Sequence, residues 1–495
     1  MAQTEPHPAS PCSSLASDHA LRRCAEIRAQ VISAGLYAPI ADAAPETHPA
    51  GLHATTTWRV SPCPLFLSHE QLAFFTNLGP QLLTFYRALN RLYQDSVKGQ
   101  QPAWVARYLD QGKPESLIAY SRMKRFRDDL PAVIRPDVIP TQDGMVITEL
   151  DSVPGGIGLT ACLSSIYSGL DAPPLSIAGG PDGMVRGFAA MLQAVQGARA
   201  GCIAIVVSDE AKDYRPEMAW LAARLRERQV EAYCVEPRDV RFTEEGLRLR
   251  LDTREQPIAL LYRFYELFDL LNIPKAELIQ YAAKKDWVSV TPPYKPALEE
   301  KSAFALLHHP VLRPFWEKEL GAATFLDLTA IMPRTWLLDP APIPPAATIP
   351  GLQMGGRAVT NWRDLAAATQ KERHYVIKPS GFSELAWGSR GVSVGHDLPQ
   401  AEWAAAIDQA LSSFPTTPYI LQEFHKGRLF ELDYWDAASQ TMQRMNGRAR
   451  LSPYYFVAGG KAELAGILAT ICSAEKKIIH GMKDAIMVPC AVPPQ

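Results

Sequence analysis

Four charged residues occupy alternate positions in two short segments of the sequence. Arg135 and Asp137 are two residues apart, and so are Glu149 and Asp151 further along the chain. If both segments are strands, each pair points its side chains to one face. Three carboxylates in one patch repel one another unless a cation or bound protons neutralise them. Carboxylate oxygens and a shared phosphate are ligands that Mg²⁺ prefers, and the arginine can clamp a phosphoryl or carboxylate oxygen through two N–H groups.

The two segments are predicted to form a β-hairpin. Residues 133–139 read as one strand, which Pro136 interrupts, and residues 145–150 read as the returning strand, with Asp143-Gly144 in the turn. A competing interpretation is an exposed, salt-bridged hairpin face, because surface charge pairs are common. The stretch SVPGGIG that follows favours a binding site. Its glycines permit close approach to a ligand, and the N-terminus of the helix predicted from about residue 159 would face an anion.

A second set of candidate residues follows the apolar strand predicted at 374–380. Lys378 lies near the end of this strand and is followed by Ser380 and Gly381. A lysine in this position can reach phosphates, while the amides of the loop contact the phosphate oxygens. The loop 380–391 contains three glycines and is predicted to close as a lid.

Two further features are weak evidence for a nucleotide site when each is taken singly. The predicted strand 418–424 contains Gln422-Glu423, and backbone groups near its end can read an adenine edge. Lys301 begins a predicted helix after a proline-rich turn and is a candidate second phosphate lysine. In a Glu-Glu-Lys run it can equally be an ordinary surface lysine, so the order and spacing of these features indicate more than each does singly.

The elements around these residues predict a mixed architecture. Residues 202–236 read as strand, helix and strand, and 258–264 as a further strand, which favours a parallel sheet in a doubly wound subdomain. Residues 69–95 read as an amphipathic helix interrupted near Pro80. From residue 286 onward, a helix at 301–320, divided by two prolines, precedes the strands and helix of an α+β layout.

Composition restricts the classes of protein to consider. The chain has 495 residues, 47% hydrophobic and 21% charged, with a net charge of −2. These values indicate several folded units and no general attraction to nucleic acid or an anionic membrane. The eight cysteines include no CxxC pair, which predicts reduced thiols in a reducing compartment. Because no signal-peptide pattern or membrane-length apolar run occurs, the expected location is the cytoplasm.

Taken in order, the motifs over about residues 120–470 resemble those of the circularly permuted ATP-grasp ligases, such as eukaryotic-type glutathione synthetase and bacterial glutathionylspermidine synthase. The family pattern is Arg-x-Asp, then Glu-x-Asn, then a small, glycine-rich stretch. This chain has Arg135-Pro-Asp137, Glu149-Leu-Asp151 and SVPGGIGLT. Later matches are TPPYKPALEEKSAFALL with Lys301, the strand VIKP with Lys378, the strand ILQEF, and finally Arg450 before a Gly-Gly stretch.

The resemblance implies ATP and Mg²⁺ as cofactors and a role for each matched residue. Metal ligation falls to Asp137, Glu149 and Asp151, transition-state stabilisation to Arg135, ATP binding to Lys301, Lys378, Ser380, Gly381, Gln422 and Glu423, and contact with a substrate carboxylate or phosphate to Arg450.

Three departures from the family pattern are visible. Asp151 replaces the metal-binding asparagine, and the lid is poorer in glycine and carries Glu384 and Arg390. The metal carboxylate expected after the Lys-Pro strand has no clear counterpart, and Glu384 is the nearest candidate.

The resemblance implies an α/β (α+β) fold with an ATP-grasp-like nucleotide-binding half, a smaller doubly wound parallel-sheet subdomain and an N-terminal helical region. The predicted domains are a helical arm and loop at 1–60, a helical region with the hairpin and glycine-rich stretch at 61–195, an αβ substrate subdomain at 196–285, and the nucleotide-binding region with its lid at 286–495.

The implied activity is ATP- and Mg-dependent ligation of a small-molecule carboxylate to an amine through an acyl phosphate. The alternatives are a non-catalytic nucleotide-binding protein with this fold, and an ATP-dependent kinase of a carboxylate.

Overall fold

The computed structural model describes residues 17–36, 58–170, 175–251, 254–344, 347–388, 390–476, 478–479 and 484–493. Most of the predicted N-terminal arm therefore lies outside the described residues. The part that is described contains helix α1 (Ser17–Ser33), which packs on helix α5 and on strands β17 and β18.

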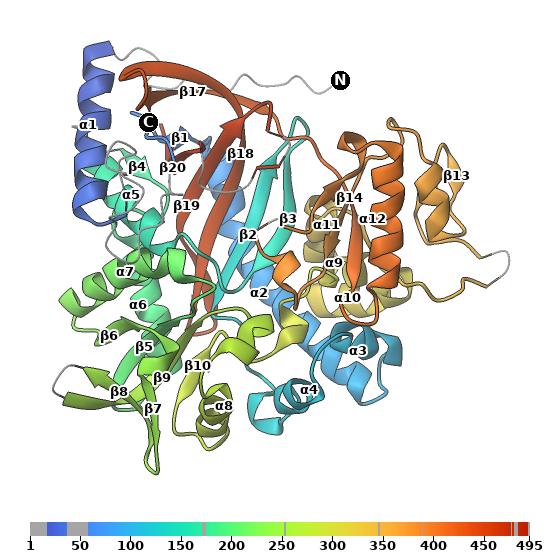
Figure 1. Cartoon of the computed structure of the whole chain (residues 1–495), viewed down its shortest axis with the longest axis horizontal. Helices are drawn as coiled ribbons and strands as arrows, with labels where there is room; N and C mark the ends of the chain where they lie inside the picture. Colours follow the sequence, from blue (N-terminus) through green and yellow to red (C-terminus); the bar gives the residue numbers. More distant parts are fainter. Residues whose placement is uncertain are drawn as a thin grey trace.

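The largest sheet is the one that carries the predicted hairpin (Figure 1). Its main order is β1-β20-β19-β18-β2-β3, with β17 also paired to β18 and β4 to β20. The strands are β1 (Leu65–Phe66), β2 (Val133–Pro140), β3 (Met145–Asp151), β4 (Ser176–Ile177), β17 (Leu429–Asp436), β18 (Thr441–Ala458), β19 (Lys461–Ser473) and β20 (Ile486–Val492). The hairpin prediction is confirmed, because β2 and β3 pair antiparallel across the turn at Asp143-Gly144.

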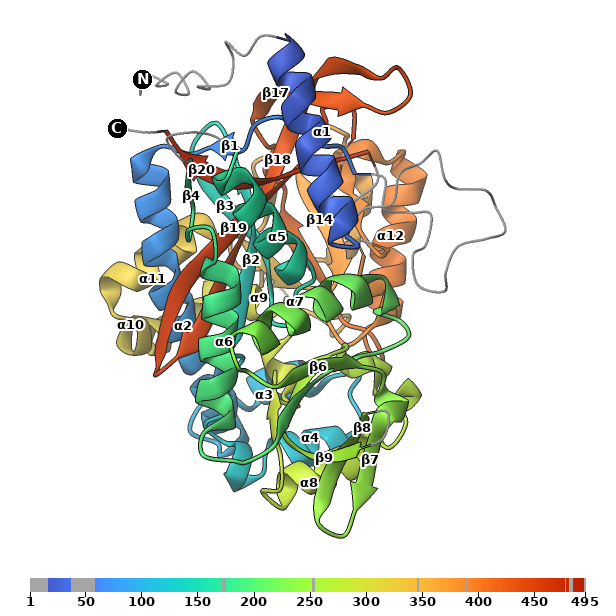
Figure 2. The ribbon, with the colours of Figure 1, turned by 90° about the vertical axis from the view of Figure 1, so that its left-hand side faces the viewer.

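Helices cover both faces of this sheet (Figure 2). Gly187 of helix α6 (Gly183–Gln196) lies against Phe456, whereas Gly79 of helix α2 (His69–Val97) lies against Tyr455. Neighbouring residues of a strand point to opposite faces, so α6 and α2 lie on opposite sides of β18. Helix α5 (Ile157–Ser168) packs beside α6 and also contacts α7 (Arg215–Glu227).

The predicted interruption of α2 at Pro80 is wrong. The helix runs through this proline from residue 69 to 97 and starts with a capping box at Ser68. Proline removes one backbone hydrogen bond inside a helix and costs about 3 kcal/mol. Apolar side chains on both sides of Pro80 are fully buried, including Phe75 before it and Phe85 after it. Burial of both halves in one core offsets the lost bond.

A second sheet contains the predicted parallel strands. Its order is β6-β5-β9-β8-β7, and β10 also pairs with β9. Strands β5 (Cys202–Val207), β6 (Ala232–Val235), β9 (Arg254–Phe264) and β10 (Ser289–Thr291) are parallel, which confirms the strand–helix–strand prediction. An antiparallel extension of β7 (Val240–Thr243) and β8 (Gly246–Leu251) was not predicted. The predicted domain boundaries stay predictions.

The third sheet holds the lysine-bearing strand. Its antiparallel order is β11-β16-β14-β15, formed by β11 (Thr335–Leu337), β14 (Tyr375–Pro379), β15 (Ser393–Val394) and β16 (Tyr419–Glu423). Helix α12 (Gln400–Ser412) packs on one face of the sheet. The helix predicted at 301–320 is divided at Pro310, as expected, into α9 (Ala303–His308) and α10 (Arg313–Leu320). Pro314 does not divide it, because this proline lies in the first turn of α10.

The remaining elements surround these sheets. They are α3 (Ala103–Asp110), α4 (Glu115–Ser121), α8 (Ala276–Lys284), α11 (Ala322–Ile331) and the small hairpin of β12 (Gln353–Met354) and β13 (Arg357–Ala358). Within the described residues, none of the helices combines the length and apolar character needed to cross a membrane.

The close approach of α2 to the sheet gives a testable prediction. A Cβ at Gly79 would lie 2.5 Å from Tyr455 Cδ1, and the Tyr455 ring is fully buried. Gly79→Ala should therefore lower the free energy of unfolding in urea by about 1–3 kcal/mol, because overpacking outweighs the better helix propensity of alanine.

Gly169→Ala is the matched control for this substitution. Its Cβ would lie 3.6 Å from the nearest atom, Ile166 O, so the change should be within about 0.5 kcal/mol of wild type. A Gly79→Ala protein as stable as the control would contradict the packing described for α2.

Candidate functional site

A cavity of about 390 Å³ lies where the three sheets meet. The first sheet contributes residues of β2, β3 and β18, and the third contributes the end of β14 and the loop after it. The second sheet contributes the loops that follow its parallel strands β5 and β9. Carboxyl ends of parallel strands are where open α/β sheets bind ligands. The predicted site residues that line the cavity are Arg135, Asp137, Glu149, Asp151, Lys301, Lys378, Gly381 and Arg450.

Strand register explains why the charged residues of the first sheet meet. Arg135 lies opposite Asp151 and Asp137 lies opposite Glu149 across the β2–β3 hairpin. Strand β18 pairs with the other edge of β2 and brings Arg450 against the same face. The prediction that these side chains share one face is therefore confirmed.

Asp137 is the shared partner of two arginines. It is 2% exposed, and its carboxylate lies 3.3 Å from Arg135 Nε and 3.1 Å from Arg450 Nη1. Ser452 Oγ also donates to Asp137 Oδ1 at 3.2 Å. Arg135 reaches Asp151 as well, with Nη2 at 2.9 Å from Oδ2. Arginine and aspartate therefore alternate across the face, and each charge has an opposite neighbour.

The charges also set the protonation of Arg135. Burial by itself lowers the pKa of its guanidinium, but Asp137 and Asp151 raise it well above the ordinary value. Arg135 is thus a permanent cation in a largely buried position, where electrostatic interactions are stronger than in water.

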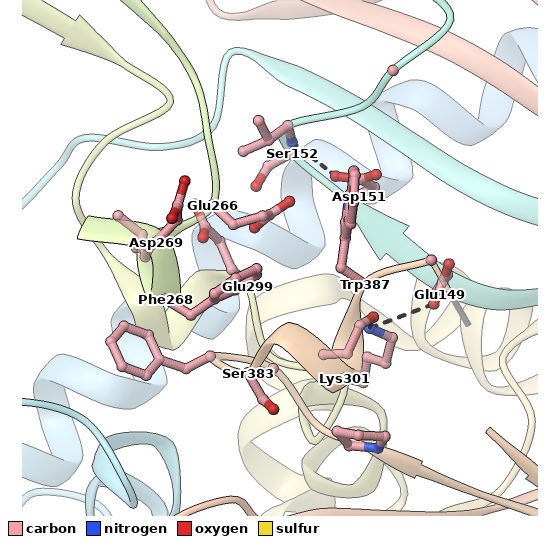
Figure 3. Close-up of a pocket in the computed structure, with 18 of the residues that line it drawn as sticks. Glu149, Asp151, Ser152, Glu266, Phe268, Asp269, Glu299, Lys301, Ser383 and Trp387 are labelled. Atoms are coloured by element: carbon pink, nitrogen blue, oxygen red, sulfur yellow. Dashed lines mark hydrogen bonds and ion pairs between the residues drawn. The ribbon is translucent and has the colours of Figure 1, made fainter. Parts of the chain in front are cut away.

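Two lysines approach the hairpin from the direction of the third sheet. Lys378 Nζ donates to Thr148 O on β3 at 2.8 Å, and Lys301 Nζ lies 3.5 Å from Glu149 Oε2 (Figure 3). Burial would raise the pKa of Glu149, but Lys301 and Lys378 lower it overall, so this carboxylate is ionised. Burial lowers the pKa of Lys378 to about 8, against the opposing effect of Glu149.

The remaining predicted ATP-binding residues lie outside this cavity. Ser380 is completely buried beneath it and binds neighbouring chain segments. Gln422 Nε2 donates to Thr335 Oγ1 at 3.1 Å. Because Gln422 and Glu423 pair with Val376 and Tyr375, they lie further along β14 from Lys378. Their predicted contacts with adenine stay predictions.

The carboxylates do not gather into a metal cage. Among the described residues, no group of three or more His, Cys, Asp or Glu side chains could hold a metal ion. The arginines occupy the positions between the aspartates, so guanidinium groups supply the neutralising charge. Glu384 is exposed and does not line the cavity. Metal ligation by Asp137, Glu149 and Asp151 stays a prediction.

Sequence reasoning missed an acidic wall on the opposite side of the cavity. Figure 3 shows Glu266, Asp269 and Glu299 grouped there, facing Asp151. Burial, and then the charge of Glu299, raises the pKa of Glu266. Glu266 could have been found, because it follows the strand predicted at 258–264, at the end where parallel sheets bind ligands. Glu299 pairs with the buried Arg263, a contact between distant segments that no local pattern indicates.

One part of the prediction for the glycine-rich stretch is corrected, the ligand anion at the helix N-terminus, whereas Gly155 does line the cavity. The helix N-terminus after this stretch faces a carboxylate of the protein itself, because Glu217 Oε1 and Oε2 accept from Gly156 N and Leu159 N at 2.6 and 3.0 Å. A Cβ at Gly158 would collide with the Glu217 main chain. Gly158 therefore lets α7 approach α5, and backbone N–H groups at the helix end bind an acceptor within the protein.

Glu217 gives a pH-dependent prediction. Burial raises its pKa from 4.5 to about 7, although Leu159 N and Gly156 N oppose the change. The folded protein thus favours the protonated carboxyl. The resulting stabilisation is complete below pH 4.5 and is lost as pH rises through about 7.

At about 1.4 kcal/mol per pKa unit, wild type should lose about 3 kcal/mol of unfolding free energy between pH 4.5 and 8, relative to Glu217→Gln. Urea unfolding of both proteins across this range measures the difference. Parallel pH profiles for the two proteins would contradict the raised pKa.

Comparisons with known proteins give a match in structure and none in sequence. No protein-family model matches the chain, and no curated protein matches it. A glutathione synthetase-like effector from Globodera pallida, solved in its apo form, superposes with a TM-score of 0.59 at 12% identity, covering 98% of this chain and 100% of that one. A Methylobacillus flagellatus KT protein assigned as a gamma-glutamylcysteine synthetase matches at 13% identity and a TM-score of 0.39, over 84% of this chain and 85% of that one.

The second match is too distant to carry an argument, so the assignment rests on the first. That match covers nearly the whole chain and shows its fold. The chain has the α+β, ATP-grasp-like fold of the glutathione synthetase-like proteins.

Proposed function

We propose that this protein is an ATP-dependent ligase that joins a small-molecule carboxylate to an amine. The observation that carries the proposal is that Lys301 and Lys378 meet Arg135 and Glu149 in one cavity. Cations from two separate parts of the fold converge there on a space of about 390 Å³. This arrangement suits a triphosphate placed between the β2–β3 hairpin and the end of β14.

Each cation has a distinct role in the proposal. Lys378 and Lys301 hold the phosphates, and the amide of Gly381 lies beside them at the start of the lid. A phosphate next to Lys378 would favour its charged form and offset the effect of burial. Arg135, fixed by Asp137 and Asp151, stabilises charge on the phosphoryl group in transfer. Arg450 binds the substrate carboxylate or a phosphate.

The carboxylates suit a magnesium ion that takes most of its ligands from the phosphates of the nucleotide. Both oxygens of Asp137 already have partners, whereas among the described residues the Glu149 carboxylate has only Lys301 at 3.5 Å. Mg²⁺ typically takes one or two protein carboxylates together with substrate phosphates and water. Both oxygens of Asp151 are also occupied, by Arg135 Nη2 and Val153 N. Glu149 would therefore be the main carboxylate that holds the ion, and Asp137 and Asp151 would act mainly by fixing the arginines. When bound, Mg²⁺ neutralises phosphate charge.

The reaction needs no nucleophilic side chain. A carboxylate oxygen of the substrate attacks the γ-phosphorus of ATP, ADP leaves, and an acyl phosphate forms. The amine nitrogen then attacks the acyl carbon, inorganic phosphate leaves, and the amide remains after loss of a proton. The protein contributes position and fixed charge. The amine is expected on the side of Glu266 and Asp269, because carboxylates attract an ammonium group.

Two supporting details concern the nucleotide base and the compartment. Gln422 and Glu423, further along the lysine-bearing sheet, would frame the adenine. Five cysteines in the described part of the chain are free thiols, which fits a reducing compartment such as the cytoplasm; they are Cys24, Cys162, Cys202, Cys234 and Cys490.

A substitution of Arg135 tests this function. With candidate acids and amines supplied, wild type should release ADP, and mass spectrometry should find an amide product. Arg135→Ala should lose about 2–4 kcal/mol of transition-state stabilisation, about 30- to 1000-fold in kcat, because a preorganised donor is removed.

Arg363→Ala, which removes an exposed arginine paired with Asp408, is the control and should keep the wild-type rate. Wild-type turnover in Arg135→Ala would refute the role of Arg135. A phosphorylated acid without amide would favour a kinase. MgATP binding with no turnover for any acid tested would favour the non-catalytic alternative.

A further inference from the structure

The two phosphate lysines are connected by a short buried network below the cavity. Ser380 lies two residues after Lys378, and its carbonyl accepts from Lys301 N at 2.7 Å. Its hydroxyl accepts from Ser302 N at 2.9 Å and donates to a carboxylate oxygen of Glu300. Three bonds from one residue therefore fasten the segment of Lys301 to the end of the strand that carries Lys378.

A buried ion pair completes this network. Glu300 Oε1 lies 2.6 Å from Lys113 Nζ, and the two side chains are 2% and 0% exposed. Lys113 comes from the turn between α3 and α4, far from both lysine segments in the sequence. Replacing such a pair with apolar residues often costs no stability. We therefore look for its role in the geometry that its directional bonds impose.

Two glycines make the approach of these charges sterically possible. A Cβ at Gly381 would lie 2.8 Å from Glu300 Oε1, so only glycine leaves room for the carboxylate. Gly112 has a φ of +75°, and a Cβ there would collide with the main chain of Thr416. Both glycines adjoin residues of the network, which shows how closely the backbone is arranged around it.

We propose that the Lys113–Glu300 ion pair, acting through Ser380, is a positioning device that holds Lys301 and Lys378 at the separation a triphosphate requires. None of its three residues lines the cavity, so the device acts on the ligand only through the two lysines. The inference rests on the proposed binding of ATP. It also assigns Ser380, which sequence reasoning placed among the ATP-binding residues, to the support of that site.

The positioning role predicts a selective loss of affinity. Ser380→Ala removes the bonds to Glu300 and Ser302 N but no group that lines the cavity. Its Kd for MgATP, measured by calorimetry, should rise about tenfold, whereas its Kd for adenosine should stay within about twofold of wild type, because adenosine lacks the phosphates. In the ligand-free protein, hydrogen exchange at Lys301 N and Ser302 N should be at least about tenfold faster.

Ser164→Ala is the matched control, because it removes a buried hydroxyl that has no hydrogen-bond partner among the residues that the structure describes. It should leave both affinities and the exchange of residues 301–302 unchanged. A Ser380→Ala protein that binds MgATP as wild type does, or loses both ligands equally, would overturn the proposal and leave the proposed function standing. Wild type that does not bind MgATP would overturn both.

The ion pair is tested with a double variant that leaves no unpaired buried charge. Lys113→Met with Glu300→Gln keeps the side-chain volumes and an amide oxygen that can accept from Ser380. This protein should fold, since neither partner is left charged without the other. Its Kd for MgATP should rise several-fold, because a neutral acceptor holds Ser380 less firmly than a carboxylate. An unchanged Kd would show that the ion pair does not help to position the two lysines.

Discussion

Buried charge must be neutralised close by, and this constraint connects the parts of the fold around the cavity. Asp137 fixes Arg135 and Arg450 on neighbouring strands of the first sheet. Glu149 attracts Lys301 to the same sheet, and Lys113 meets Glu300 below it. Apart from Arg135, which is two residues from Asp137 on β2, each of these partners comes from a segment distant in the sequence. The geometry of the cavity is therefore a consequence of ion pairing as much as of apolar packing.

Two basic side chains of the cavity are held in place by neighbouring groups. Arg135 has aspartates on two sides, and Lys378 is tied to the backbone of β3. A ligand that carries negative charge would meet groups already oriented for it, so little reorganisation would be needed on binding. Electrostatic preorganisation of this kind is the largest single contribution in many enzymes that stabilise developing charge. The same fixed charges suit a phosphoryl group in transfer.

Local pattern was sufficient for the elements that carry the site. Alternation of Arg135 with Asp137 and the Asp143-Gly144 turn predicted the hairpin, and apolar runs predicted β5, β9, β14 and β16. Long-range contacts decided the rest. Burial of apolar side chains on both sides of Pro80 keeps α2 continuous, and the N-terminus of α5 binds Glu217 in place of a ligand. No spacing rule could have joined Lys113 to Glu300, because the pair depends on how three separate segments pack.

The central claim is that one triphosphate touches both the hairpin and the lysine-tipped strand. A crystal structure with Mg²⁺ and a non-hydrolysable ATP analogue tests it most directly. The account predicts phosphate oxygens within hydrogen-bond distance of Lys378 Nζ and Lys301 Nζ, with the γ-phosphate facing Arg135. An analogue bound elsewhere, or one whose phosphates contact neither lysine, would contradict it.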